Sequence, residues 1–406
     1  MLTLNYEFKL KPTKEQILII ENILTACRKV WNYALRERKD WVNSRKCKVN
    51  ACSLEHEYII KADEPFPDYH IQAKRLTEAK KTNPELKAVN AQVLQQVLRT
   101  LDRAWADMQS RNFGFPRFKK HFRIKSFVFP QLKGEVFKGN QVKLPQLGWI
   151  RFHQSRPIPE GFAVKQARVI RRATGYFVML CLQLDVNVPA VPFQGHSIGV
   201  DIGLESFLAT SDGELVARPK FFDSLHRKME LLQRRLKHKK LGSNNRRKLN
   251  AKIAKLHQKL SSTRKDFHFK TAHYLCDQAG AIFVEDIDFR AWAKGIFCKH
   301  TLDASFGQFF TLLNYIAWKR GVFFAKIDKN YTSQTCPECN ALTGKKDLSQ
   351  RVHSCPECGY TTNRDVAAAQ VIRNRGIAAV GQPVVENAYG LVLTGVSSNT
   401  NLVEWG

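Results

Sequence analysis

The sequence predicts an α+β protein with several domains, and three patterns along its 406 residues support this prediction. Short alternating apolar runs separated by glycines predict an antiparallel β unit over residues 127–186. After the Pro-rich stretch 187–196, apolar strands interleave with helical segments, which is typical of an α/β layer. Two Cys-Pro-Glu-Cys motifs further on predict a small metal-binding module. A chain of this length is also too long for one small core.

The charge balance points to an acidic partner. The chain carries 65 Lys and Arg against 36 Asp and Glu, a net charge of +29. Because repulsion among these cations costs the folded state free energy, and because phosphates neutralise Lys and Arg well, nucleic acid is the favoured partner. A basic ribosomal protein or a protein of membrane surfaces is the alternative on composition alone.

The sequence also favours an intracellular protein without a membrane partner. No apolar run reaches eighteen residues, and the N-terminus lacks the apolar stretch of a signal peptide. The cysteines outside the two motifs have no spacing that suggests a disulfide framework, which favours a reducing compartment. They are Cys27, Cys47, Cys52, Cys181, Cys276 and Cys298.

The first half begins with a strand and continues with helices. Apolar residues alternate over 1–11, which predicts a half-buried strand ended by Pro12. Thr13 and Gln16 have the spacing of a capping box at the start of a helix, and a second strong helix is predicted from Asn90 to Arg111. We expect the first strand to join the β unit, which has the pattern of a small barrel. The helices would then be an insertion between its strands.

The second half begins with three successive strands around 197–217, with Asp212-Gly213 as a hairpin turn. Residues 225–265 hold fifteen Lys or Arg and one acid, with apolar residues at helical spacing and a break at 242–244. This pattern predicts a basic helical hairpin. A strand over 281–285, a helix over 305–320 and a strand over 321–328 complete the α/β layer.

Three acidic residues lie in or beside these apolar elements. Asp201 lies within a strand, Glu285 ends another, and Asp365 precedes a predicted helix. A charged group in such a place is costly unless it is paired or binds a metal. Three together predict a site for Mg²⁺, with two ions, of the kind that hydrolyses phosphodiesters. Each acid alone could equally be structural. The order Asp, Glu, Asp after a three-strand start is typical of the RuvC branch of RNase H-like folds, whereas a final Glu would indicate an integrase-type transposase.

The cysteine motifs have the spacing of a zinc ribbon. Cys336 and Cys339 form the first pair, and Cys355 and Cys358 form the second, fifteen residues later. Four thiolates close a tetrahedral Zn²⁺ site with no open position, so one structural ion is expected. His353 is expected at the surface. Lys345, Lys346 and Arg351 of the intervening loop could contact nucleic acid, although a purely structural brace is the alternative.

Aromatic and basic residues interleave over 111–129. Such a pattern suits single-stranded nucleic acid, because bases stack on aromatic rings beside cations that neutralise phosphates. For the six phenylalanines we favour the alternative that they enter the β core, and for the cations we favour phosphate contact. The candidate nucleic-acid contacts, here and in the basic hairpin, are Arg111, Arg117, Lys119, Lys120, Arg123, Lys125, Arg234, Arg235, Arg246 and Arg247.

Together these motifs resemble the TnpB family, transposon-encoded relatives of the type V CRISPR effectors. The resemblance rests on GVDIGL around Asp201, FVEDID around Glu285, NYTSQTCPEC and HSCPECGYTTNRDVAAAQ. GFPRFKK and KLPQLGWIRF in the first half support it. The sequence differs from the commonest family pattern at two positions: Asn363 stands where Asp is frequent, and Ala367 stands where Asn is frequent.

The resemblance implies an RNA-guided DNA endonuclease. Such a protein binds a guide RNA from its transposon end, recognises a short motif beside a double-stranded DNA target, and cuts with one RuvC site. It implies Asp201, Glu285 and Asp365 as catalytic, metal-binding residues and the four cysteines as zinc ligands. A prokaryotic cytoplasmic, nucleoid-associated location follows, with monomer and dimer both open. The alternatives are an RNA-guided DNA-binding repressor without nuclease activity and a transposition accessory factor that recognises DNA through protein alone.

The resemblance also implies how the domains divide the chain. The implied parts are a wedge β-barrel domain at 1–11 and 119–190, a helical recognition domain at 12–118, a RuvC-like nuclease domain at 196–330 and 361–380 containing the basic hairpin 223–275, a zinc ribbon at 331–360, and a C-terminal tail at 381–406.

Overall fold

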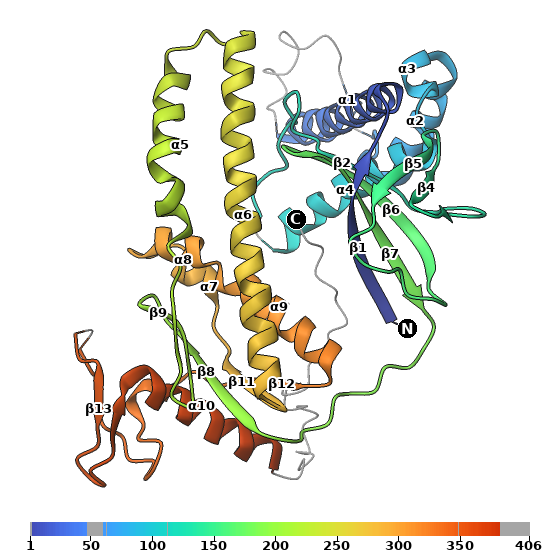
Figure 1. Ribbon diagram of the computed structural model, residues 1–406. Coiled ribbons are helices and arrows are strands. Elements are labelled where there is room, and N and C mark those ends of the chain that lie inside the picture. The colour runs from blue at the N-terminus through green and yellow to red at the C-terminus, as the bar shows by residue number, and fades with distance from the viewer. Residues whose placement is uncertain (1, 47–59, 62, 112, 348, 382–406) are drawn as a thin grey trace. The chain divides into compact units, whose positions relative to one another are not determined.

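The computed structural model describes residues 2–46, 60–61, 63–111, 113–347 and 349–381 (Figure 1). The chain divides into two compact units, Met1–Val188 and Pro189–Gly406. The division falls inside the Pro-rich stretch 187–196. From residue 382 on, the expected C-terminal tail lies outside the described residues.

The first unit contains a seven-stranded antiparallel sheet in the order β2-β6-β7-β1-β5-β4-β3. Its strands are β1 (Leu2–Lys11), β2 (Ser126–Phe129), β3 (Phe137–Lys138), β4 (Gln141–Leu144), β5 (Gly148–His153), β6 (Ala163–Arg172) and β7 (Gly175–Leu184). As expected, β1 joins this sheet and pairs with both β7 and β5. The sheet is a half-barrel, since no pairing between described residues joins the outer strands β2 and β3. The closed small barrel expected from the sequence is therefore not formed by these pairings.

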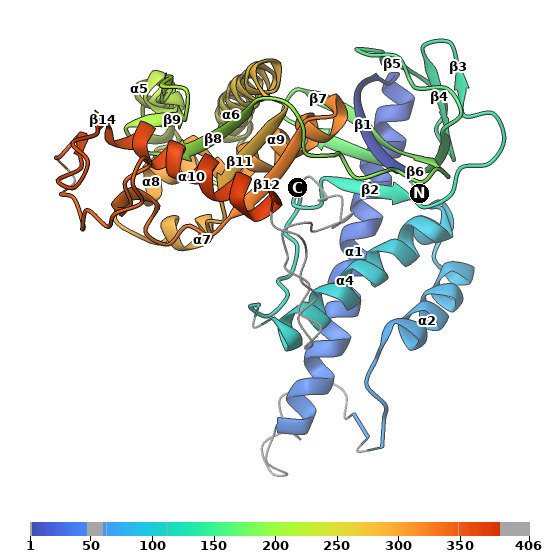
Figure 2. The same ribbon diagram turned by 90° about the horizontal axis from the view of Figure 1, so that it is seen from below.

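Four helices lie among the described residues between β1 and β2. They are α1 (Lys14–Lys46), α2 (Tyr69–Thr82), α3 (Pro84–Lys87) and α4 (Ala91–Ser110). The capping box at the start of α1 is confirmed, because the Thr13 amide donates to Gln16 Oε1 at 3.0 Å and the Gln16 amide donates to Thr13 Oγ1 at 3.3 Å. Figure 2 shows α4 running beside α1 and α2.

A fully buried guanidinium joins these helices. Arg38 of α1 donates to Gln72 of α2 at 3.1 Å and to Asp102 of α4 at 2.9 Å. It also lies over the ring of Trp105, with its Cζ 5.7 Å from the ring centroid. A buried charge is tolerated only when its partners are in place, so the helical insertion has a defined packing of its own.

The second unit contains a five-stranded sheet in the order β10-β9-β8-β11-β12. Its strands are β8 (Ser197–Ile202), β9 (Ser206–Thr210), β10 (Leu215–Ala217), β11 (Ala281–Glu285) and β12 (Phe323–Ile327). The first three are antiparallel, whereas β8, β11 and β12 are parallel. The predicted hairpin turn joins β9 and β10, and Gly213 supplies the positive φ of 96° that a residue with a side chain rarely adopts.

Two layers of helices cover this sheet. The helices are α5 (Phe221–Lys237), α6 (Asn244–Gln278), α7 (Phe289–Trp292), α8 (Cys298–Ala304), α9 (Phe306–Arg320) and α10 (Arg364–Gly381). Residues of α6 and α9 pack on the face that carries Ile198, Val200 and Ile282. Ile372 of α10 packs on the other face, against Ala281 and Phe283. Successive residues of a strand point to opposite faces of the sheet, so alternate residues of β8 and β11 pack against the two helix layers.

The basic helical hairpin forms as predicted. In Figure 1, α5 and α6 lie side by side, and Ser243 caps α6 by accepting the Arg246 amide at 3.2 Å. The zinc module lies between β12 and α10. It contains the 3-10 helix η1 (Thr332–Gln334) and the antiparallel pair β13 (Val352–Ser354) and β14 (Thr361–Asn363). Among the described helices, none has the length and apolar character needed to cross a membrane.

The buried imidazole of His268 makes the stability of this unit depend on pH. Its Nε2 lies 2.9 Å from the Ala304 carbonyl oxygen, and burial lowers its pKa to about 4. The unfolded chain therefore takes up a proton near pH 6.5 that the folded protein refuses until about pH 4. We expect stability to fall through this window as pH decreases, by up to about 1.4 kcal/mol per pH unit from this group. Urea unfolding of the wild type and of His268→Gln should show a shallower pH dependence for the variant. Equal slopes would contradict the assignment.

Candidate functional site

The three acidic residues predicted from the sequence belong to elements that meet at one face of the second sheet. In β11, Ala281 and Phe283 face α10, so Glu285 points the same way by alternation. In β8, Gly199 faces α10, and Asp201 follows it by two residues. The parallel register pairs Val200 with Val284, which places Asp201 and Glu285 side by side at the next position.

Glycines allow α10 to lie directly on this face and bring Asp365 to it. A Cβ on Gly199 would lie 2.0 Å from the Ala369 carbonyl oxygen, and a Cβ on Gly376 would lie 2.2 Å from the Phe283 ring. Asp365 is one helical turn before Ala369, and Asp201 is one pleat beyond Gly199. The helix therefore presents Asp365 at the end of the sheet where Asp201 and Glu285 lie.

Asn363 fixes the start of this helix. Its side-chain oxygen accepts the amide of Asp365 at 2.9 Å and that of Val366 at 3.4 Å, which is an N-terminal cap. The substitution of Asn for the Asp that is frequent in the family pattern therefore keeps an acceptor where the helix needs one. Ala367, the second departure, is buried.

The electrostatics of the site are those of carboxylates held close together. Burial raises the pKa of Asp201 well above its ordinary value, and the negative charges of Glu285 and Asp365 raise it further. Arg364 acts in the opposite direction. Burial likewise raises the pKa of Glu285. An arrangement that makes carboxylates costly to ionise is one that a divalent cation stabilises.

Thr332 is a residue of this site that the sequence reasoning missed. Its hydroxyl donates a hydrogen bond to Glu285 Oε1, and both side chains are buried. The signal was present in the NYTSQT segment that carries the family resemblance, but nothing in the sequence pairs this loop with β11. Thr332 therefore holds one oxygen of Glu285 in a fixed direction.

The three carboxylates are spread more widely than the ligands of one small ion. Within the described residues, the four cysteines are the one group of three or more Cys, His, Asp or Glu side chains whose ligand atoms all lie within 4.8 Å of one another. In a two-metal site the ions themselves lie about 3.5–4 Å apart, so its ligands need not form so tight a group.

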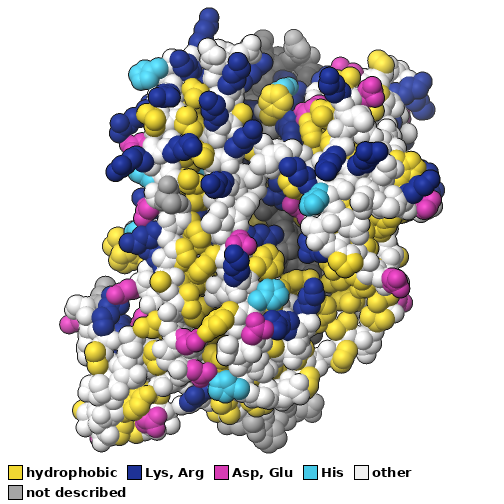
Figure 3. Space-filling model, viewed as in Figure 1, with side chains coloured by type: hydrophobic (Ala, Val, Ile, Leu, Met, Phe, Trp, Pro, Cys, Tyr) yellow, Lys and Arg dark blue, Asp and Glu magenta, His cyan; other side chains and the backbone are white. Residues whose placement is uncertain are grey.

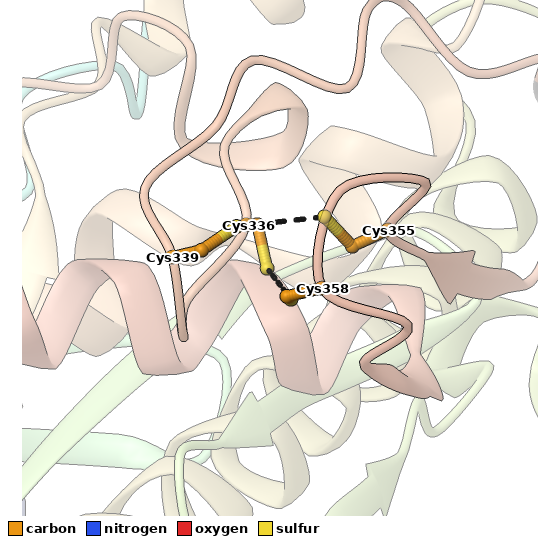
Figure 4. A group of neighbouring side chains, drawn as sticks. All are labelled: Cys336, Cys339, Cys355 and Cys358. Atoms are coloured by element: carbon orange, nitrogen blue, oxygen red, sulfur yellow. Dashed lines mark hydrogen bonds between the residues drawn. The ribbon is translucent and has the colours of Figure 1, made fainter.

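The four cysteines gather at one point, as the sequence predicted (Figure 4). The sulfurs of Cys336 and Cys358 are 3.6 Å apart, and those of Cys339 and Cys355 are also 3.6 Å apart. Four sulfurs at about 2.3 Å from a tetrahedral zinc ion would be separated by about 3.8 Å. The group fits a structural zinc ion.

The two knuckles have nearly the same backbone. Cys336 donates its amide to Ala341 and Cys355 donates its amide to Tyr360, each at 2.9 Å. Asn340 and Gly359, which follow the second cysteine of each pair, both have positive φ, 59° and 73°. The repeated turn aims both cysteines of each pair at the shared centre.

The zinc module is tied to the helix that carries Asp365. Asn374 of α10 donates to the Pro337 carbonyl in the first knuckle at 2.9 Å. The guanidinium of Arg364 donates to the Asp347 carbonyl in the intervening loop at 2.8 Å. The module is therefore attached to the start and to the middle of α10, which favours its role as a brace for that helix.

The predicted surface position of His353 in the module loop is wrong. His353 is fully buried, because β13 alternates and turns this residue inward, toward Tyr360. Lys346 is buried as well and donates to the Ser333 carbonyl at 2.8 Å. Arg351 forms an ion pair with Glu205. Lys346 thus has a structural partner in place of the expected nucleic-acid contact, whereas Arg351 keeps half of its side chain exposed and its contact with nucleic acid stays a prediction.

The basic hairpin exposes most of its cations. Figure 3 shows Lys and Arg side chains spread over the face formed by α5 and α6. Arg234, Arg235 and Arg247 are exposed, with Arg234 paired to Glu230 at 2.6 Å. Arg246 has a structural task, since it donates to the Leu236 and Lys239 carbonyls at the end of α5.

The aromatic segment divides into two parts. Phe127 and Phe129 lie in β2 and are buried, as expected. The preference for burial is wrong for four others that precede this strand and remain 42–58% exposed, namely Phe113, Phe115, Phe118 and Phe122. The candidate cations of this segment are exposed except for Lys119, which is partly buried over the ring of Trp31.

Family models match three parts of the chain. A model described as "Probable transposase" of the OrfB_IS605 type matches residues 180–294. A "Cas12f1-like, TNB domain" model matches residues 306–372, which include the zinc module. A helix-turn-helix model of the OrfB_IS605 type matches residues 1–47, where the structure has β1 and the single long helix α1.

Two curated proteins resemble the chain over nearly its whole length. "Putative RNA-guided DNA endonuclease InsQ" of Escherichia coli K12 is 28% identical and covers 94% of this chain and 92% of its own. A "Putative RNA-guided DNA endonuclease" of Streptomyces pristinaespiralis is 27% identical, covering 92% and 89%. A Cas12f1 complex with sgRNA and target DNA aligns with 18% identity and a TM-score of 0.34 over 92% of this chain and 99% of the other. CasPhi-2 bound to crRNA aligns with 10% identity and a TM-score of 0.43 over 95% and 99%.

Proposed function

This chain belongs to the TnpB family of relatives of the Cas12 effectors, and we propose that it is an RNA-guided DNA endonuclease. Relatives matched over most of both chains are named for this activity. The net charge of +29 fits two nucleic-acid partners, a guide RNA and a double-stranded DNA target. Base pairing would select the target, and the protein would recognise a short adjacent motif.

The observation that carries the proposal is the position of Asp201, Glu285 and Asp365 on one face of the five-stranded sheet. The strand order, with three antiparallel strands followed by two parallel ones, fits an RNase H-like domain of the RuvC type. Two Mg²⁺ ions bound there would activate water and stabilise the leaving oxygen of a phosphodiester. The chain itself supplies the carboxylates, fixes Glu285 through Thr332, and places Asp365 through the capped start of α10.

The other parts of the chain would bind the guide RNA and the DNA target or support the nuclease site. The half-barrel would act as the wedge domain and α1 to α4 as the recognition domain, while one Zn²⁺ bound by the four cysteines would hold the module against α10. The exposed cations of α5 and α6 would line a path for nucleic acid.

The presence of all three acids supports the nuclease over the first alternative, a repressor without nuclease activity. Such a protein has no need to keep three carboxylates together at the cost seen in the raised pKa of Asp201. The second alternative, an accessory factor that recognises DNA through protein alone, predicts that no discrete RNA accompanies the protein.

Sequencing of co-purified RNA tests the proposal. The gene is expressed with its native flanking DNA, and the RNA bound to the purified protein is sequenced. We expect one RNA species with a constant scaffold followed by a guide, and we expect that DNA matching this guide is cut when Mg²⁺ is added. Heterogeneous fragments, or no RNA, would reject guided recognition.

Thr332→Val tests whether the hydrogen bond that positions Glu285 matters for cleavage while Glu285 itself is retained. The substitution keeps the shape of the side chain and removes the hydroxyl that holds Glu285 Oε1. We expect cleavage to slow by about 10- to 100-fold, the usual effect of losing a hydrogen bond to a metal ligand, with a higher Mg²⁺ requirement. Target binding should not change. Thr332→Ser keeps the donor and should retain cleavage, and equal losses in both variants would show that the methyl group matters instead.

A further inference from the structure

We propose that residues 113–123 form a stacking platform, on which exposed phenylalanine rings hold unpaired bases of a nucleic acid while neighbouring cations bind its phosphates. The rings are those of Phe113, Phe118 and Phe122, which are 58%, 44% and 58% exposed. Phe115 is 42% exposed and packs edge-on against Trp105, so it anchors the segment to α4. The nucleic-acid partner follows from the proposed function, whereas the platform rests on its own geometry.

The backbone of the platform is fixed although it belongs to no helix or strand. Asn32 of α1 makes two hydrogen bonds with the Lys119 backbone, accepting its amide at 2.7 Å and donating to its carbonyl at 3.0 Å. Trp31 Nε1 donates to the Arg117 carbonyl at 3.1 Å. Arg171 of β6 donates to the Phe122 carbonyl at 3.2 Å. The exposed rings therefore lie on a loop whose backbone is already fixed by hydrogen bonds. Binding of a base would then cost little conformational entropy in this loop.

Phe122 combines backbone strain with an exposed ring. Its φ of 64° lies in the left-handed region that a bulky residue seldom adopts. The residues on either side, His121 and Arg123, are not glycines either, so the left-handed conformation falls on a residue with a large side chain. Such strain persists where the surrounding structure enforces it, and it gathers at binding sites. Here the strain does not serve to bury the ring, which remains 58% exposed.

The positive charges around the rings favour a ligand that carries phosphates beside its bases. Residues 111–125 contain six Lys or Arg and no acid. Lys39 Nζ lies 5.9 Å from the centroid of the Phe118 ring. The Arg171 guanidinium carbon lies 4.9 Å from the centroid of the Phe122 ring, but Arg171 is ion-paired with Glu21 and 17% exposed, so it holds this ring in place and is not counted among the cations that bind phosphate. An apolar core or an apolar protein partner would have to desolvate these cations. A single strand offers both a flat base for each ring and a phosphate for each cation.

The test compares binding of three short probes by the full-length protein after bound nucleic acid has been removed. The probes are oligouridylate, oligothymidylate and an abasic strand of the same length and charge. In the main variant, Phe113, Phe118 and Phe122 are changed to Leu, which keeps apolar area and removes the aromatic face. Phe297→Leu is the matched control, because Phe297 is 52% exposed in the other unit. A double variant that leaves Phe122 unchanged guards against misfolding at the strained position.

We expect about a tenfold loss of affinity per ring for a base-containing strand, with the abasic strand bound as before and the salt dependence unchanged. Greater loss with oligouridylate would assign the platform to RNA, and greater loss with oligothymidylate would assign it to unwound DNA. Unchanged affinity, or equal loss for the abasic strand or in Phe297→Leu, would overturn the platform. Guided cleavage by the wild type is measured in parallel, so a failed platform with intact cleavage rejects this inference alone.

Discussion

Asp201→Asn is expected to abolish DNA cleavage and to leave guided binding of the target intact. The substitution keeps the size of the side chain and removes the charge that would hold a catalytic cation between β8, β11 and α10. Losing one such electrostatic partner of a transition state slows reactions by on the order of a thousandfold. Cleavage of a guide-matched DNA and gel-shift binding of the same DNA, both with saturating Mg²⁺, measure the two effects separately.

The same variant should be more stable than the wild type in magnesium-free buffer. Burial and two neighbouring carboxylates raise the pKa of Asp201, which means that folding disfavours its charged form. At neutral pH a neutral Asn relieves this cost, so the variant should unfold at a higher temperature than the wild type. Thermal unfolding measures it. A gain in stability with a loss of activity is the signature of a functional residue.

Asp286→Asn is the matched control for this experiment. Asp286 is adjacent to Glu285, but its side chain is 68% exposed and pairs with Lys326. We expect it to cut normally with little change in stability. If Asp201→Asn lost binding and cleavage together, or lost stability, Asp201 would be a structural residue and the two-metal assignment would be wrong.

Cys336→Ser is expected to release zinc and to destabilise the second unit. Cys336 is fully buried, its sulfur is 3.6 Å from that of Cys358, and its neighbour Pro337 is held by α10. Binding of a structural zinc ion contributes about 10–16 kcal/mol to small zinc domains, so losing one of four ligands should lower the zinc content well below one ion per chain. Because the module braces α10, cleavage should fall as well. Metal analysis and thermal unfolding provide the measurements.

Cys298→Ser controls for the loss of a thiol as such. Cys298 lies in α8, is partly buried, and is not part of the cysteine cluster. Its substitution should leave zinc content and cleavage unchanged. Unchanged zinc content in Cys336→Ser would instead contradict binding by four thiolates.

Local elements could be read from the sequence because each depends on neighbours a few residues away. The capping box of Thr13 and Gln16, the turn at Gly213 and the break before α6 all depend on such short-range hydrogen bonds or backbone preferences. The paired cysteines are similar, since each knuckle closes within a few residues. In each case the interaction that forms the structure lies within the few residues that make up the pattern.

The wrong predictions concern side chains whose burial depends on contacts with residues far away in the sequence. Phe113 and Phe122 were expected in the core because phenylalanine is usually buried, but bonds from α1 and β6 hold their loop outside the sheet. His353 was expected at the surface because it lies in the loop between the two cysteine pairs, and Lys346 of the same loop was a candidate for contact with nucleic acid. The direction of β13 and the carbonyl of Ser333 bury them. None of these partners lies within the local pattern that supported the prediction.

The sequence by itself determined which residues could do chemistry: three acids in apolar elements and four cysteines in paired turns. Tertiary structure alone decided that the acids share a face, since this depends on the parallel register of β8 with β11 and on α10 lying over Gly199 and Gly376. It alone added Thr332 to the site and turned four phenylalanines outward. The physical reason is that the residue type sets what a group can bind, whereas the packing of distant segments sets which groups meet.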